Sequence, residues 1–121
     1  MICIIIRADD EIEVRDDFDG SLQDYQDAVG GYIESVPVIL PGVTAYVNEE
    51  GKINGLPLNV PATALLKYPG DMIVGDMLLI GTGEDGDDAS VPPGTLKIVL
   101  EGLTSQPYES FFGEGEAPVD Y

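Results

Sequence analysis

The stretch DAVGGYIESVPV, residues 27–38, decides the fold, because the period of its apolar residues changes there from that of a helix to that of a strand. Ser21 is suited to cap a helix, and Gly30 stands where glycine commonly ends one in the left-handed conformation. The apolar face between them consists of Leu22, Tyr25, Ala28 and Val29. These features predict a helix over residues 22–29.

Gly30 and Gly31 follow this helix, and the second glycine lets the chain turn sharply into a strand over residues 32–39. The two faces of that strand alternate, with Tyr32, Glu34, Val36 and Val38 on one side and Ile33, Ser35 and Ile39 on the other. A tight join between helix and strand is our preferred interpretation. A ligand loop is the alternative, but a glycine pair outside a G-x-G-x-x-G or P-loop motif carries little information about phosphate binding.

The N-terminal run MICIIIRA, residues 1–8, is almost continuously apolar and predicts a strand buried on both faces. The next run, EIEVRD, residues 11–16, alternates apolar and charged residues as a half-buried strand does. The intervening ADDE suits a hairpin turn. We therefore expect the first two strands to form an antiparallel pair.

The remaining segments predict further strands and a short helix. VTAYVNEE, residues 43–50, alternates like a strand, and DMIVGDMLLIG, residues 71–81, contains one or two strands with a bend at Gly75 and Asp76. Asn59 is suited to cap a short helix across residues 60–66. GTLKIVLEGL, residues 94–103, is apolar, but its pattern does not decide between helix and strand.

The chain therefore predicts a single α+β domain over residues 1–103, with a mostly antiparallel sheet of about five strands, one main helix and a short second helix. Its 121 residues suit one domain, and a hydrophobic content of 44% is enough for a core. Residues 104–121 lack periodicity and are expected to form a flexible acidic tail. Phe111 and Phe112 in this tail suit a docking peptide, an oligomer contact or plain disorder.

The charge balance excludes a simple nucleic-acid binder. Asp and Glu number 23, Lys and Arg 5 and His 0, which gives a formal net charge of −18. Binding to a phosphate backbone needs clustered cations, but the cations here are few: Arg7, Arg15, Lys52, Lys67 and Lys97. Three interpretations of the acidity stay open: hydration in a salt-rich cytoplasm, imitation of DNA charge toward a basic partner, or solubility alone.

The residue types that usually carry catalysis are scarce. His is absent, and the single cysteine, Cys3, lies in an apolar run where we expect it to be buried. We therefore predict no catalytic residue, no cofactor and no metal site. The acidic loop GEDGDD, residues 83–88, lacks the EF-hand order and is expected to be solvated. No apolar stretch is long enough to span a membrane, so we expect a soluble cytoplasmic protein.

Candidate binding residues gather in two turn regions, GGY and NEEGKINGLPLN. They are Gly30, Gly31, Tyr32, Asn48, Glu49, Glu50, Lys52, Asn54 and Asn59. Neighbours on a strand point to opposite faces, so only one of Glu49 and Glu50 should enter a given pocket. The asparagines also suit plain turn hydrogen bonds. Tyr25, Tyr32 and Tyr46 could line a groove that stacks on an aromatic ligand, although their phases favour core packing.

Three segments together resemble a known family: VGGYIE, residues 29–34, then NEEGKINGLPLN with a following AT, and then DMIVGDMLL, residues 71–79. They resemble domain of unknown function family DUF3846, small proteins encoded mainly by phages, prophages and plasmids. The likeness covers residues 1–81 and includes the order of the elements. It implies no activity, since none is assigned to the family, but it favours a mobile-element protein that acts on host machinery or host signals.

Our leading hypothesis is a non-enzymatic binding protein of phage or mobile-element type that engages a host protein or a small nucleotide-like ligand through the two turn regions. The second hypothesis is a DNA mimic that occupies the basic site of a nuclease or repressor. The third is an enzyme that depends on carboxylates or on a divalent ion. We expect neither direct nucleic-acid binding nor membrane binding, and the sequence leaves the oligomeric state open.

Overall fold

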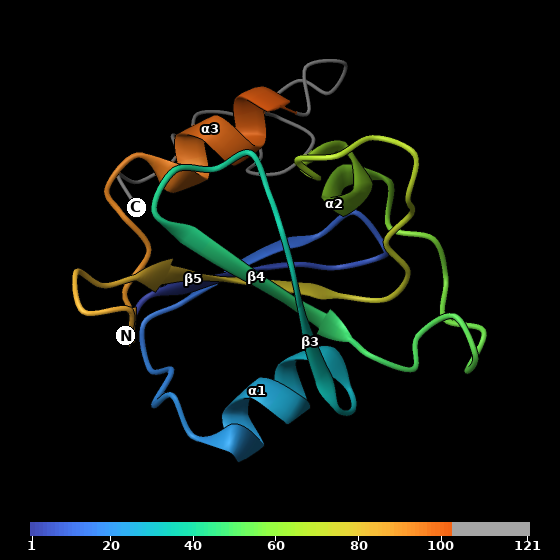
Figure 1. Ribbon diagram of the computed structural model, residues 1–121, viewed down its shortest axis with the longest axis horizontal. Coiled ribbons are helices and arrows are strands. Elements are labelled where there is room, and N and C mark those ends of the chain that lie inside the picture. The colour runs from blue at the N-terminus through green and yellow to red at the C-terminus, as the bar shows by residue number, and fades with distance from the viewer. Residues whose placement is uncertain (103–121) are drawn as a thin grey trace.

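The computed structural model describes residues 1–102, which form one antiparallel sheet with helices on both faces (Figure 1). The strands are β1 (Cys3–Ile6), β2 (Ile12–Arg15), β3 (Ile33–Val36), β4 (Val43–Asn48), β5 (Met77–Thr82) and β6 (Asp88–Ala89). Their order in the sheet is β2-β1-β5-β4-β3, and the short β6 pairs with β5. The helices are α1 (Leu22–Val29), α2 (Val60–Ala64) and α3 (Thr95–Gly102). In Figure 1, α1 lies below the sheet, and α2 and α3 lie above it.

The predicted α+β class is confirmed, and the structure extends it. The described residues form a 6-stranded sheet and three helices, where the sequence predicted about five strands and two helices. β6 has only 2 residues, too few to show an alternating pattern. α3 is the segment that the sequence left undecided, and its buried residues recur at helical spacing: Leu96, Val99 and Leu100.

β1 and β5 are neighbours in the middle of the sheet, and both are buried on their two faces. Toward α2 and α3 they contribute Ile4, Ile6, Met77 and Leu79. Toward α1 they contribute Cys3, Ile5, Leu78 and Ile80. The predicted burial of the N-terminal run is therefore confirmed. Each such large apolar side chain stabilises a fold by about 1.5–3 kcal/mol when it is fully buried, so these two strands carry much of the core.

α1 begins and ends as predicted. The Ser21 hydroxyl accepts a hydrogen bond from the backbone N–H of Asp24 at 3.1 Å, and Gly30 ends the helix in the left-handed conformation with φ 79°. The buried face of the helix consists of Tyr25, Ala28 and Val29. Leu22 has the predicted phase but is 61% exposed, so the first residue of the helix adds little to the core.

β3 covers Ile33–Val36 and is shorter than the strand predicted over residues 32–39. Pro37 follows at once and has no backbone N–H with which to continue the ladder. After Pro37 the chain forms an isolated β-bridge between Val38 and Leu66. Proline therefore ends this strand although the alternation of apolar residues continues past it.

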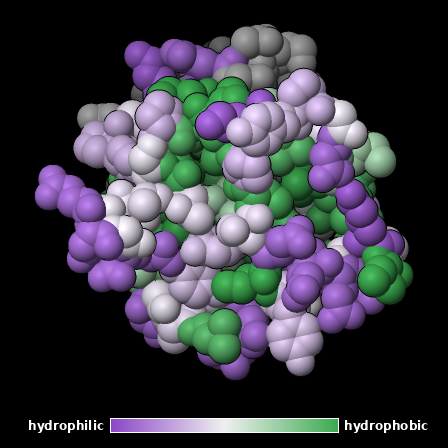
Figure 2. Space-filling model, in the orientation of Figure 1, coloured by the Kyte–Doolittle hydropathy of each residue, from purple (hydrophilic) through white to green (hydrophobic). Residues whose placement is uncertain are grey.

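Apolar residues also reach the surface of the domain. Those around α2 and the segments beside it include Ile39, Leu58, Val60, Tyr68 and Met72. Figure 2 shows apolar residues gathered between α3 and α2 in the upper half of one face, and a more polar lower half around α1. The two ends of the molecule therefore differ in character, and the polar end carries the candidate site.

Two further expectations concern membrane-spanning helices and the acidic tail. Within residues 1–102, each helix is too short or too polar to cross a bilayer. The predicted acidic tail, residues 104–121, lies outside the described residues, together with Phe111 and Phe112.

Candidate functional site

The C-terminal end of α1 borders an open surface pocket of about 290 Å³. Its walls come from α1, from the glycine join, from the residue before β3, and from the end of β4 with the turn that follows. The lining residues are Gln26, Gly30, Gly31, Tyr32, Asn48, Glu50 and Asn54. All but Gln26 are binding residues that the sequence predicted, so the fold brings the two predicted turn regions together.

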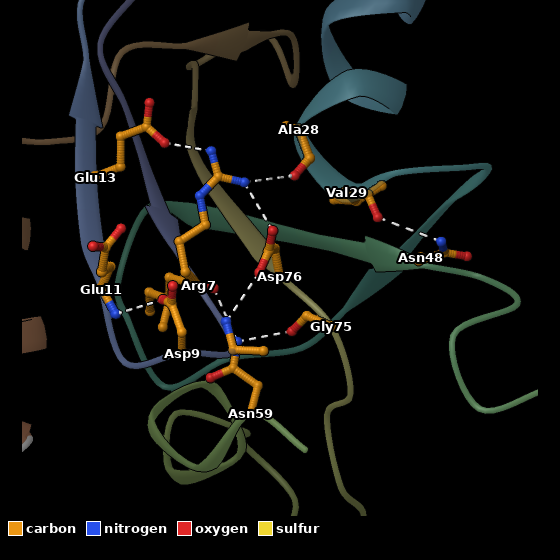
Figure 3. Close-up of polar contacts among 12 residues, drawn as sticks. Arg7, Asp9, Glu11, Glu13, Ala28, Val29, Asn48, Asn59, Gly75 and Asp76 are labelled. Atoms are coloured by element: carbon orange, nitrogen blue, oxygen red, sulfur yellow. Dashed lines mark hydrogen bonds and ion pairs between the residues drawn. The ribbon is translucent and has the colours of Figure 1, made fainter. Parts of the chain in front are cut away.

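The end of α1 is held by hydrogen bonds to its last carbonyl groups. The backbone N–H groups of Gly30 and Gly31 both donate to the carbonyl oxygen of Gln26, at 2.7 and 3.1 Å. The Asn48 amide donates to the carbonyl oxygen of Val29 at 3.4 Å (Figure 3). This end of a helix carries the negative end of its dipole. The pocket therefore lies beside the negative end of the α1 dipole.

Asn48 connects the end of α1 to the turn after β4. Its side chain is buried, and its Oδ1 accepts a hydrogen bond from the backbone N–H of Glu50 at 2.8 Å. The same turn is tied to the start of β3, because the Glu49 N–H donates to the Tyr32 carbonyl oxygen at 2.8 Å. A Cβ atom on Gly31 would lie only 2.8 Å from Asn48 Nδ2. A side chain at position 31 would therefore press on the Asn48 amide.

We expect Gly31→Ala to lower the free energy of unfolding by about 1–3 kcal/mol, because the new methyl group displaces the Asn48 amide from its hydrogen bonds. Urea denaturation followed by circular dichroism measures this change. In an Asn48→Ala background the same substitution should cost clearly less, since the amide that the methyl group strikes is gone. Equal costs in the two backgrounds would contradict the steric explanation.

The three tyrosines considered for an aromatic groove separate in the structure. Tyr25 and Tyr46 pack edge to face on the α1 side of the sheet, with ring centroids 5.1 Å apart, and the Tyr25 hydroxyl donates to the Asp88 carboxylate. Burial, reinforced by the Asp88 charge, raises the pKa of both hydroxyl groups, so they stay neutral at ordinary pH. Tyr32 is 63% exposed and lies at the pocket. Of the three, Tyr32 alone lines the pocket.

Glu49 and Lys52 were also predicted as binding residues, but they do not line the pocket. Glu49 is exposed next to Glu50, as the expectation that only one of the pair enters a pocket requires. The Lys52 Nζ lies 2.7 Å from Asp71 Oδ1 in an exposed ion pair. The cation nearest in sequence to the pocket is therefore paired with a carboxylate outside the pocket lining.

Asn59 caps α2, as predicted, but it cannot reach a ligand because its side chain is fully buried. Its Oδ1 accepts a hydrogen bond from the Ala62 N–H at 3.1 Å. Its Nδ2 donates to the carbonyl oxygens of Ile6 and Gly75, at 2.9 and 2.8 Å. Asn59 therefore joins α2 to the end of β1 and to the bend before β5, and it does not line the pocket with the other predicted residues.

Gln26 is a pocket residue that sequence reasoning missed. It precedes Gly30 by one helical turn, so the two lie on the same side of α1. The spacing of the predicted helix contained this information, because any ligand beside the glycine join must also meet the residue one turn earlier.

Arg7 joins four elements at the same end of the sheet (Figure 3). Its guanidinium forms ion pairs with Glu13 of β2 and, at 2.8 Å, with Asp76 just before β5. It also donates to the Ala28 carbonyl oxygen of α1 at 3.5 Å. Burial disfavours its charge, but the hydrogen bonds to the two carboxylates raise its pKa. Sequence reasoning missed this cluster because its partners share no local pattern.

The groups that reach the pocket are suited to recognition. The lining residues carry three side-chain amides (Gln26, Asn48 and Asn54), one carboxylate (Glu50) and one aromatic ring (Tyr32). Cys3 is elsewhere, in the core, where burial raises the pKa of its thiol to about 11 and keeps it neutral at ordinary pH. Residues 1–102 contain no group of three or more side chains placed to hold a metal ion.

Comparison with known proteins identifies the family of the chain. No curated protein and no solved structure matches the chain significantly. The family model described as Domain of unknown function (DUF3846) matches residues 1–104 of the 121. The match agrees with the resemblance carried by the glycine and asparagine turns, and it extends beyond residues 1–81 to include α3. The chain therefore belongs to the DUF3846 family.

Proposed function

We propose that the protein is a non-enzymatic binding protein of phage or mobile-element type, which acts in the cytoplasm and engages a host protein through the pocket at the end of α1. The observation that carries this proposal is the assembly of six predicted binding residues around one pocket, although they come from separate segments of the chain. The hydrogen bonds of Asn48 hold these segments in place. A site that is already formed loses less entropy on binding than one that must be ordered.

The composition of the pocket favours a protein partner over a nucleotide. Within the part of the chain that the structure describes, its lining holds one carboxylate, Glu50, and no lysine or arginine that could receive a phosphate group. Its exposed aromatic residue, Tyr32, is of a type that often anchors protein interfaces. We therefore place a host protein first and a nucleotide-like ligand second.

Affinity capture from a host extract tests the proposal. Tagged protein should retain a stoichiometric partner, identified by mass spectrometry of the eluted proteins and small molecules. Tyr32→Ala should reduce the amount retained about tenfold, because truncation of a central aromatic anchor typically costs more than 1 kcal/mol of binding.

Tyr68→Ala is the matched control, since Tyr68 is 64% exposed but lies outside the pocket lining. It should retain the partner as the unmodified protein does. Retention by Tyr32→Ala at the level of the control, or equal loss from both variants, would count against the pocket as the binding site.

A further inference from the structure

The geometry points to a guanidinium group as the chemical group that the pocket receives, supplied by an arginine side chain of the partner. This inference rests on the proposed function and names the chemistry of its ligand. Three features of the pocket carry it: its charge, its aromatic face and its arrangement of hydrogen-bond acceptors.

The charge of the pocket selects a cation. Among residues 1–102, Glu50 is the only charged residue in its lining, and no lysine or arginine forms an ion pair with it. The carbonyl end of α1 adds partial negative charge to the same wall. The net charge of −18 makes the surrounding potential negative as well. An anion would be repelled here, while a cation is attracted at long range and held at short range.

The aromatic and amide groups select a planar cation. Tyr32 is 63% exposed and lines the same pocket as Glu50, and a guanidinium can stack on an exposed tyrosine ring while it donates in its own plane. The side-chain oxygens of Gln26 and Asn54 provide acceptors in addition to the carboxylate. A guanidinium presents five N–H donors in a fixed plane, whereas an ammonium is a compact point charge. Several acceptors around one aromatic face therefore suit arginine better than lysine.

The size of the pocket agrees with a side chain. Pockets for drug-sized ligands occupy roughly 300–1,000 Å³. The value here, about 290 Å³, lies just below that range. The pocket therefore has room for an arginine side chain or a small free guanidinium compound.

Titration of the ¹⁵N-labelled protein, followed by amide chemical shifts, tests the inference. The probe is N-acetylarginine methylamide, and the comparison is its citrulline analogue, in which a neutral urea group replaces the guanidinium. We expect saturable shifts at Gly30, Gly31 and Asn54, with binding about tenfold tighter for the arginine compound because its hydrogen bonds to the carboxylate are charge-assisted. Equal affinity for the two compounds, or shifts confined to other residues, would overturn the inference.

Two neighbouring carboxylates provide matched variants. Glu50→Gln should weaken arginine binding about three- to fivefold, whereas Glu49→Gln should change it little, because both remove one exposed charge but only Glu50 lines the pocket. Tyr32→Leu should weaken binding to a similar extent through loss of the aromatic face. Equal effects of Glu49→Gln and Glu50→Gln would mean that net charge alone attracts the probe, which contradicts a built site.

Peptides distinguish whether the guanidinium group comes from a protein or from a small molecule. A short peptide that contains one arginine should bind more tightly than the free arginine compound if the natural ligand is a protein, and the same peptide with lysine should bind less well. Equal binding of peptide and free compound would support a small guanidinium molecule as the natural ligand. If uncharged adenosine shifts the pocket amides and the arginine compound does not, the guanidinium inference fails while the proposed binding function stands.

Discussion

Asn59→Ala is expected to lower the free energy of unfolding by about 3–5 kcal/mol, because it leaves three buried backbone groups without their hydrogen-bond partners. The Asn59 amide donates to the carbonyl oxygens of Ile6 and Gly75 and accepts from the N–H of Ala62. These groups belong to the end of β1, the bend before β5 and the first turn of α2. A loss of this size is a large fraction of the roughly 5–15 kcal/mol that stabilises a typical domain.

Urea denaturation followed by circular dichroism measures the loss, and Asn54→Ala is the matched control. Asn54 is exposed in the turn after β4, so its removal should change the free energy of unfolding by less than about 0.5 kcal/mol. If Asn59→Ala does not fold, Asn59→Asp keeps the cap acceptor and should still be less stable than the unmodified protein, because it loses the amide donors. Similar stabilities for the Asn59 and Asn54 variants would contradict the role assigned to Asn59.

Gly81→Ala is expected to cost about 3 kcal/mol or more, because β5 has no room for a side chain at this position. An ideal Cβ atom on Gly81 would lie 2.0 Å from the carbonyl oxygen of Ser90. The segment that would have to move is fixed to the N-terminus. Ser90 Oγ accepts from the Ile2 N–H at 2.8 Å, and the Val91 N–H donates to the Ile2 carbonyl oxygen at 2.9 Å.

Gly86→Ala separates this steric effect from the general effect of replacing glycine. Gly86 has φ 85° and open space around its Cα atom, so alanine there should cost only the strain of the left-handed conformation, about 1 kcal/mol. Both substitutions restrict the unfolded chain equally, so the difference in thermal or urea midpoint reports on the folded state. A Gly81 variant as stable as the Gly86 variant would show that the segment at Ser90 moves freely.

Local signals in the sequence predicted the elements whose causes are local. The caps at Ser21 and Gly30, the hairpin between β1 and β2 and the bend at Gly75 all depend on residues close together in the chain. The burial of the N-terminal run also followed from its own composition. α3 stayed undecided because its segment is apolar at several successive positions, so that neither period stands out.

The candidate site depended on a pairing that single segments do not reveal. β3 and β4 pair so that Ile33 lies opposite Asn48, and this register places the glycine join beside the turn after β4. The prediction named most of the pocket residues because both regions carry turn signals. It also named Asn59, whose burial depends on tertiary packing. The same limitation concealed Arg7, whose partner Asp76 lies far along the chain.

The position of β5 has a consequence for the synthesis of this protein. β1 and β4 are made first, but neither reaches its inner neighbour until residues 77–82 have left the ribosome and inserted between them. Pairings between strands so distant in sequence form slowly, because the entropy of closing a long loop is lost before any stabilising contact forms. In a nascent or truncated chain that ends before β5, β1 and β4 each keep an open edge that β5 covers in the finished sheet, and such edges promote aggregation.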